Sequence, residues 1–164
     1  MTGDRSQGLR FLPLGIDVRG KHCLVVGGGS VGTRKVHVLQ RAGAIVTVVS
    51  PDVAAELAEL IEAGRLRWVK DSFRQEHLGD TFLVVAATSD QRVNQTVVRL
   101  GAGQGILVCD ASSAERSDVI FGALLQRDDA TVAVFTDGRD PARARRTRDE
   151  IAALLAARKP KPQC

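Results

Sequence analysis

Short apolar runs alternate with segments of helical periodicity along the first two thirds of the chain. The apolar runs are rich in β-branched residues, which is typical of strands buried on both faces of a sheet. Strands are predicted over residues 22–26, 45–49, 66–69, 82–87 and 106–109, with 66–69 near an edge. Helices are predicted between them over residues 30–42, 52–63 and 90–102. This alternation predicts a doubly wound, Rossmann-like α/β domain with a parallel sheet over residues 8–110.

The pattern changes after residue 110. A polar stretch leads to two further predicted strands, 119–125 and 131–135, joined by a turn at 127–129. A basic helix then follows over residues 141–157. About 45 residues are too few to bury a core of their own. We therefore expect residues 111–157 to form a small α+β dimerisation segment that packs on a second copy of the chain, and residues 158–164 to form a flexible basic tail.

Composition places the chain among ordinary globular proteins. It has 164 residues, of which 44% are apolar and 26% charged. No apolar run approaches the roughly 20 residues that cross a bilayer, and the first residues lack the apolar stretch of a secretory signal. The three cysteines have no metal-binding or redox spacing. These features predict a cytoplasmic protein with no membrane partner and no resident metal.

Positive charge is concentrated near the carboxyl terminus. Residues 139–164 hold eight basic and three acidic side chains, against a net charge of +4 for the whole chain. A basic cluster attracts anions such as nucleic acid, acidic lipid or a polycarboxylate, and a solvated helix face is the plain alternative. Aromatic residues are only 4% of the chain and tyrosine is absent, which argues against a nucleic-acid partner.

A glycine-rich motif of the form G-x-G-x-x-G joins the first predicted strand to the first predicted helix. Gly27 permits a tight turn, Gly29 lets a diphosphate approach the backbone, and Gly32 lets the helix pack closely on the sheet. The free N–H groups of the helix terminus favour phosphates. A glycine turn without a ligand is the alternative. The residues predicted to bind NAD here are Gly27, Gly28, Gly29, Ser30, Val31 and Gly32.

The second predicted strand ends without the acidic residue that usually binds the adenosine ribose. Ser50 stands at that position, followed by Pro51 and Asp52, and these three residues complete the predicted ribose end. No arginine follows the strand to receive a 2′-phosphate, so the sequence favours NAD over NADP.

Two other strand ends carry candidate residues. Ala87 and Thr88 follow the most apolar strand, where small residues leave room for a cofactor and the hydroxyl can contact it. Ser89 or Asp90 is expected to cap the next helix. Asp110 follows the last strand of the sheet, where a carboxylate can serve as a general base or form a turn.

The chain resembles the precorrin-2 dehydrogenase / sirohydrochlorin ferrochelatase family, whose members include the N-terminal part of siroheme synthase. The resemblance rests on segments 11–14, 25–35, 42–44, 48–51 and 82–90, with Val93-Asn94 following in the family's order. It implies oxidation of precorrin-2 to sirohydrochlorin with NAD as hydride acceptor, Asp110 taking or relaying a proton. It also implies a homodimer, and in some members insertion of Fe2+ to give siroheme.

The resemblance gives the basic cluster a role, because the tetrapyrrole substrate is rich in carboxylates that pair with arginine. The residues predicted to bind it are Thr136, Arg139, Arg143, Arg145 and Arg146. The chain departs from the family at Leu107, in a longer loop after residue 110, at Gly122 and in segment 136–141. These departures motivate the alternative of a non-catalytic dinucleotide- or tetrapyrrole-binding module.

Overall fold

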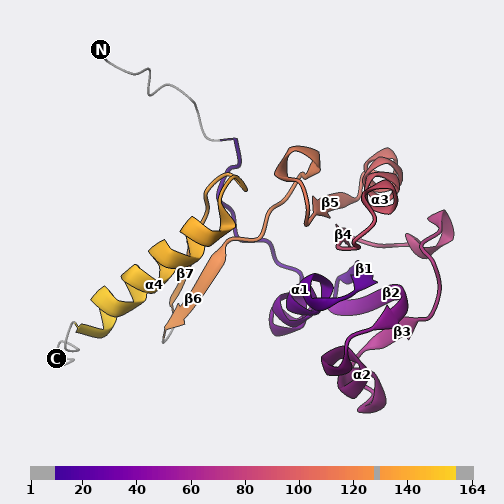
Figure 1. Ribbon diagram of the computed structural model, residues 1–164, viewed down its shortest axis with the longest axis horizontal. Helices are drawn as coiled ribbons and strands as arrows, with labels where there is room; N and C mark the ends of the chain where they lie inside the picture. Colours follow the sequence, from indigo (N-terminus) through magenta and orange to yellow (C-terminus); the bar gives the residue numbers. More distant parts are fainter. Residues whose placement is uncertain (1–9, 128–129, 158–164) are drawn as a thin grey trace. The chain divides into compact units, whose positions relative to one another are not determined.

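The computed structural model describes residues 10–127 and 130–157 (Figure 1). The chain forms two compact units. One comprises residues 14–119, and the described part of the other comprises residues 10–13 together with 120–127 and 130–157.

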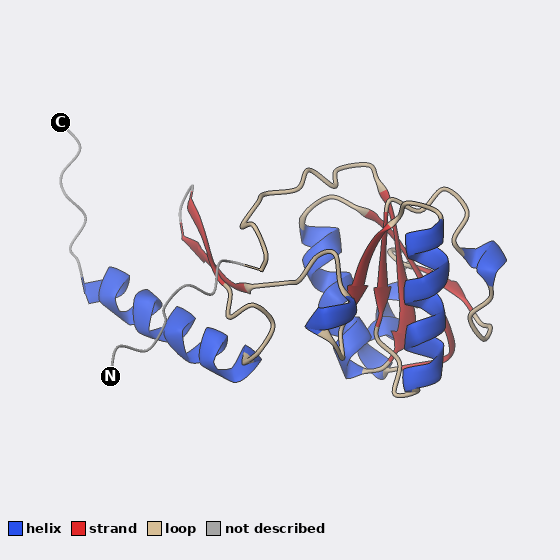
Figure 2. Ribbon diagram, turned by 90° about the horizontal axis from the view of Figure 1, so that it is seen from above, coloured by secondary structure: helices blue, strands red, loops and turns tan. Residues whose placement is uncertain are grey.

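The first unit is built on a five-stranded parallel sheet with the strand order β3-β2-β1-β4-β5. Helices cover both sides of this sheet (Figure 2), so the predicted Rossmann-like fold is confirmed. The strands are β1 (His22–Gly28), β2 (Ile45–Val53), β3 (Arg67–Val69), β4 (Leu83–Ala86) and β5 (Leu107–Asp110); the helices are α1 (Ser30–Arg41), α2 (Ala55–Glu62) and α3 (Gln91–Gly103). A single 3-10 turn, η1 (Gln75–His77), precedes β4.

The apolar core explains why these segments form a sheet. Val26, Val84, Val97 and Val108 belong to one buried cluster that joins β1, β4, β5 and α3. After β1 the chain crosses to β2 on one side, whereas β4 lies on the other side of β1. A reversal of this kind leaves a crevice at the carboxyl ends of the central strands, which is where ligands bind in doubly wound folds.

The structure corrects the predicted boundary between the second strand and the second helix. β2 continues through Pro51 to Val53, and α2 begins at Ala55 rather than at Asp52. The reason is pairing with β1: Val53 lies opposite Gly28, whose carbonyl accepts a hydrogen bond of 2.8 Å from the Ala54 N–H. Asp52 is therefore part of an exposed strand end instead of a first helical turn.

Residues 111–119 stay with the sheet. The N–H of Asp118 donates to the Val108 carbonyl at 2.8 Å, and the Asp118 carboxylate accepts from the Val108 N–H at 3.1 Å. A 3-10 turn, η2 (Ala114–Arg116), lies within this segment. Because Val119 also bonds to Val108, the strand predicted from residue 119 begins only at Ala123.

The second unit contains an antiparallel pair, β6 (Ala123–Arg127) and β7 (Ala130–Val134), followed by α4 (Pro141–Ala157). The helix spans the predicted range. Of the described residues in this unit only Ala144 is buried. The predicted tail 158–164 and most of the predicted turn 127–129 lie outside the described residues. No helix in the described ranges has the length and apolar character that a membrane crossing requires.

Candidate functional site

A cleft of about 500 Å³ lies at the carboxyl ends of the central strands. The turn after β1 forms its floor, the end of β2 forms one side, and the residues after β4 form the other. The predicted cofactor residues that line it are Gly27, Gly28, Gly29, Ser30, Val31, Ser50, Pro51, Ala87 and Thr88. Gly32 and Asp52 do not line it. The fold thus gathers residues from three predicted strand ends at one place.

The glycines of the motif differ in what surrounds them. Gly27 has a φ of +112°, and a Cβ there would lie 2.5 Å from the Ala87 carbonyl oxygen. A Cβ on Gly32 would overlap the carbonyl oxygen of Gly27, so close packing of α1 on the turn requires glycine. At Gly29 no atom lies within 4 Å of the Cβ position. This open space beside the backbone is where a diphosphate can approach.

The amino terminus of α1 is suited to an anion. Gly29 is its N-cap, with no side-chain cap and no acidic residue in the first turn. The Thr33 hydroxyl donates to the Gly29 carbonyl at 3.0 Å and thereby fixes the first turn. The N–H groups at the start of a helix carry a partial positive charge. Such a terminus is suited to stabilise a phosphate placed over Gly29.

The side of the cleft where the sequence predicts the ribose is formed by the end of β2 and the loop after β3. Ser50 is almost fully buried, and its carbonyl accepts a hydrogen bond of 2.9 Å from the Trp68 indole. Ser72 and Phe73, in the loop after β3, also line the cleft and were not predicted. Their position after a strand of the same sheet was the available signal, because the carboxyl ends of parallel strands share one edge.

Thr88 is held by Asn94 of α3, which sequence reasoning did not single out as a site residue. The Thr88 hydroxyl lies 2.8 Å from Asn94 Oδ1 and 2.9 Å from the Asp90 carbonyl. The amide of Asn94, a fully buried side chain, donates to the Thr88 carbonyl at 3.0 Å. Asp90 caps α3 by accepting from the N–H of Arg92 at 2.8 Å, as expected for one residue of this pair. These bonds fix the backbone that borders the cleft.

Asp110 lies beside the cleft but is not part of its lining. It pairs in register with Ala86, the residue before Ala87. Its carboxylate accepts bonds from the Ser112 N–H at 2.9 Å, from the Ser112 hydroxyl at 2.6 Å and from Arg116 Nε at 2.8 Å. The side chain is 0% exposed. The carboxylate is thus at the predicted strand end and is covered by the segment that follows it.

The two described cysteines are poor nucleophiles. Burial raises the pKa of both Cys23 and Cys109 to about 11. Lys35 lies near Cys109, and burial lowers the pKa of its ammonium group. Because the thiolate is the reactive form, neither thiol is suited to nucleophilic chemistry near neutral pH.

The predicted substrate residues lie in the second unit: Thr136 and Arg139 precede α4, and Arg143, Arg145 and Arg146 lie in its first turns. The Thr136 hydroxyl donates to the Asp140 carbonyl at 2.8 Å, and the Asp140 carboxylate accepts from the N–H of Arg143 at 2.8 Å. Asp140 therefore caps the helix locally. Arg139, Arg143, Arg145 and Arg146 are exposed. Among residues 10–127 and 130–157, no three His, Cys, Asp or Glu side chains gather as a metal site.

The parallel sheet, the glycine turn and the uncapped helix terminus define the class of doubly wound nucleotide-binding proteins. A model of the putative NAD(P)-binding family matches residues 14–123, and the chain belongs to this family.

The same fold and sequence pattern occur in related proteins. The chain is similar to SirC, a precorrin-2 dehydrogenase of known structure, with a TM-score of 0.78 and 32% identity over 88% of this chain and 71% of that one. It is 36% identical over 147 residues to siroheme synthase of Nitrosococcus oceani, and 38% identical over 149 residues to siroheme synthase 1 of Pectobacterium atrosepticum. These matches cover 90% and 91% of this chain but only 31% of each relative, so the chain spans about a third of their length.

Proposed function

We propose that the chain oxidises precorrin-2 to sirohydrochlorin with NAD as the hydride acceptor. The observation that carries the proposal is the similarity to SirC, which extends over 88% of the chain and so includes more than the nucleotide-binding unit. The cleft at the glycine turn supports it independently, because its residues fit a dinucleotide.

The proposed cofactor residues contact different parts of NAD along the cleft. The open position at Gly29 and the N–H groups of the α1 terminus receive the diphosphate. Ser50 and Pro51 border the adenosine ribose, where an arginine for a 2′-phosphate is absent from the β2 end. Ala87 and Thr88 border the nicotinamide half, with the Thr88 backbone fixed by Asn94. Bound NAD supplies the acceptor for two electrons and one hydrogen.

Removal of two hydrogens from the macrocycle requires an acceptor for a proton as well as one for hydride. One hydrogen departs with two electrons as hydride, and the other departs as a proton while a new double bond forms in the macrocycle. We propose Asp110 as the acceptor or relay of this proton, since a carboxylate is a suitable general base and lies at the adjacent strand end.

The arginines in and just before α4 are proposed to bind the substrate's carboxylates. Thr136, Arg139, Arg143 and Arg146 belong to a unit whose described residues bury only Ala144. Leu154 of α4 is 70% exposed. A unit with so little buried surface is stabilised by association, and we propose a homodimer formed through this unit.

The proposed reaction is tested by anaerobic incubation of the protein with precorrin-2 and NAD, followed through NADH absorbance. We expect NADH to form from NAD, NADPH to form more slowly from NADP, and neither to form without substrate. The matched variant that should lose activity is Gly29→Val. The backbone angles of Gly29 suit valine, and a Cβ built there meets no atom within 4 Å. The variant should therefore fold yet block the diphosphate. Tetrapyrrole binding without NADH formation would instead identify a non-catalytic module. Addition of Fe2+ to the product mixture tests chelation separately.

A further inference from the structure

Arg116 is the side chain that closes over the Asp110 carboxylate. Its Nε donates to Asp110 Oδ2 at 2.8 Å, while its Nη2 donates to Gln91 Oε1 at 2.9 Å and to the Ser112 hydroxyl at 3.3 Å. Gln91 and Ser112 are neutral. Among the described residues, Asp110 is therefore the anion that Arg116 contacts, and the guanidinium depends on it for charge neutralisation.

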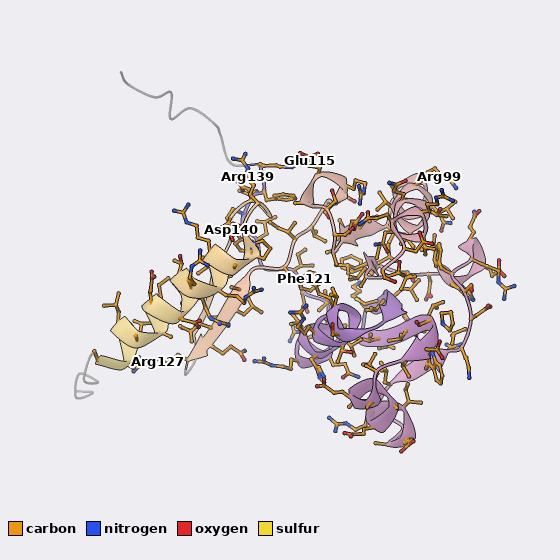
Figure 3. The ribbon with its side chains drawn as sticks, in the orientation of Figure 1. Arg99, Glu115, Phe121, Arg127, Arg139 and Asp140 are labelled. Carbon is orange, nitrogen blue, oxygen red and sulfur yellow. The ribbon has the colours of Figure 1, made fainter. Side chains whose placement is uncertain are left out.

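The two partners differ in exposure. The Asp110 side chain is 0% exposed, whereas 33% of the Arg116 side chain is exposed. Figure 3 labels Glu115, the neighbour of Arg116 in η2, and Arg99 on the separate helix α3. Because the guanidinium is partly exposed and the carboxylate is covered, a ligand that approaches the carboxyl end of β5 meets the guanidinium first.

This arrangement conflicts with direct proton transfer to Asp110, because a fully covered carboxylate cannot contact a substrate. Moving Arg116 into water alone is unfavourable, since it leaves a buried charge without its partner. An incoming carboxylate removes part of this cost, because the guanidinium then exchanges one anion for another. Guanidinium groups bind carboxylates through charge-assisted hydrogen bonds, so the exchange keeps the same bond type.

We infer that Arg116 binds a carboxylate of the substrate and in doing so uncovers Asp110. The inference rests on the proposed function for the polycarboxylate nature of the substrate. It assigns to Arg116 a binding role at the β5 end, separate from the arginines of α4, and it makes access to the proton acceptor dependent on substrate.

The test is an equilibrium titration of the full chain with uroporphyrin, a stable octacarboxylate porphyrin, without NAD. We expect Arg116→Gln to weaken binding about tenfold or more, the value of a charge-assisted hydrogen bond. Arg116→Lys should recover part of the affinity, because lysine keeps the charge but lacks the planar fork. Arg99→Gln is the matched control, an exposed arginine on α3 outside the cleft lining, and should bind as the unaltered chain does.

The variant Asp110→Asn distinguishes two models: exchange of the Arg116 guanidinium between Asp110 and the ligand, or a fixed structural ion pair. If the guanidinium is shared between Asp110 and the ligand, removal of the internal charge should leave porphyrin affinity equal to that of the unaltered chain or raise it. Equal weakening in Asp110→Asn and Arg116→Gln would overturn the exchange, as would unchanged binding in Arg116→Gln or equal loss in Arg99→Gln. If Arg116→Gln fails to fold, Arg116→Lys still must bind less tightly than the unaltered chain. The titration involves no turnover, so a failed NADH assay would refute the proposed function and leave this result interpretable.

Discussion

Asp110 and its donors show how one buried residue organises the end of β5. Three hydrogen bonds converge on the carboxylate, two from Ser112 and one from Arg116. Its own N–H donates to the Ser117 hydroxyl at 2.9 Å. These bonds satisfy an ionised carboxylate away from water, which is the condition for burying a charge at tolerable cost.

Replacing Asp110 with asparagine should separate catalysis from cofactor binding. We expect turnover to fall about 100-fold or more, the range attributed to general acid–base catalysis. Affinity for NAD should stay within about threefold, because Asp110 does not line the cleft and the phosphate site belongs to α1. Initial rates and an NAD titration provide both values.

The control for this variant is Asp80→Asn, which alters an acidic side chain that is 85% exposed. This variant should change neither the turnover rate nor the affinity for NAD. A parallel loss of NAD affinity in Asp110→Asn would show that the carboxylate supports the dinucleotide site instead of the reaction.

At the residue scale, the sequence predicts where a candidate site residue lies better than it predicts which side chains contact that residue. Asp110 was predictable because it ends an apolar run. Its burial was not, because the covering arginine lies in a polar segment whose turn depends on the long-range bonds between Asp118 and Val108. Asn94 was missed as a site residue for the same reason, since its amide acts on Thr88 through the packing of α3 against β4.

At the scale of elements, the cap of α3 links stability to the cleft. Asp90 accepts from the N–H groups of Arg92 and Val93 and also lines the cleft. Asp90→Ala should lower the free energy of unfolding by about 1 kcal/mol, the usual value of such a cap. Urea denaturation measures this change. Gln95→Ala, at an exposed position of the same helix, should leave stability nearly unchanged, and an equal loss in both variants would contradict the capping role.

Most element types were predictable from periodicity, whereas two boundaries were not. β2 extends to Val53 because the β1 backbone pairs with it, and no local pattern distinguishes Pro51-Asp52 in a strand from the start of a helix. The start of β6 moved to Ala123 because Val119 bonds to Val108 across the chain. Both errors arise where a distant backbone segment determines the local conformation.

At the scale of the whole molecule, the second unit is the proposed site of assembly. Its described residues bury only Ala144, and Leu154 is largely exposed. We expect sedimentation velocity at micromolar concentration to give twice the chain mass of 17.6 kDa. Leu154→Glu should shift the equilibrium toward single chains, because a charge at an apolar contact must be desolvated. A single-chain mass for the unaltered protein would contradict the homodimer.

The central claim is that the glycine-turn cleft and the β5 carboxylate together perform a hydride-transfer oxidation. The most direct measurement quantifies NADH and sirohydrochlorin from the same anaerobic incubation with precorrin-2 and NAD. The account predicts one NADH for each sirohydrochlorin, and neither product above background with Gly29→Val. Sirohydrochlorin without an equal amount of NADH, or full activity in that variant, would contradict it.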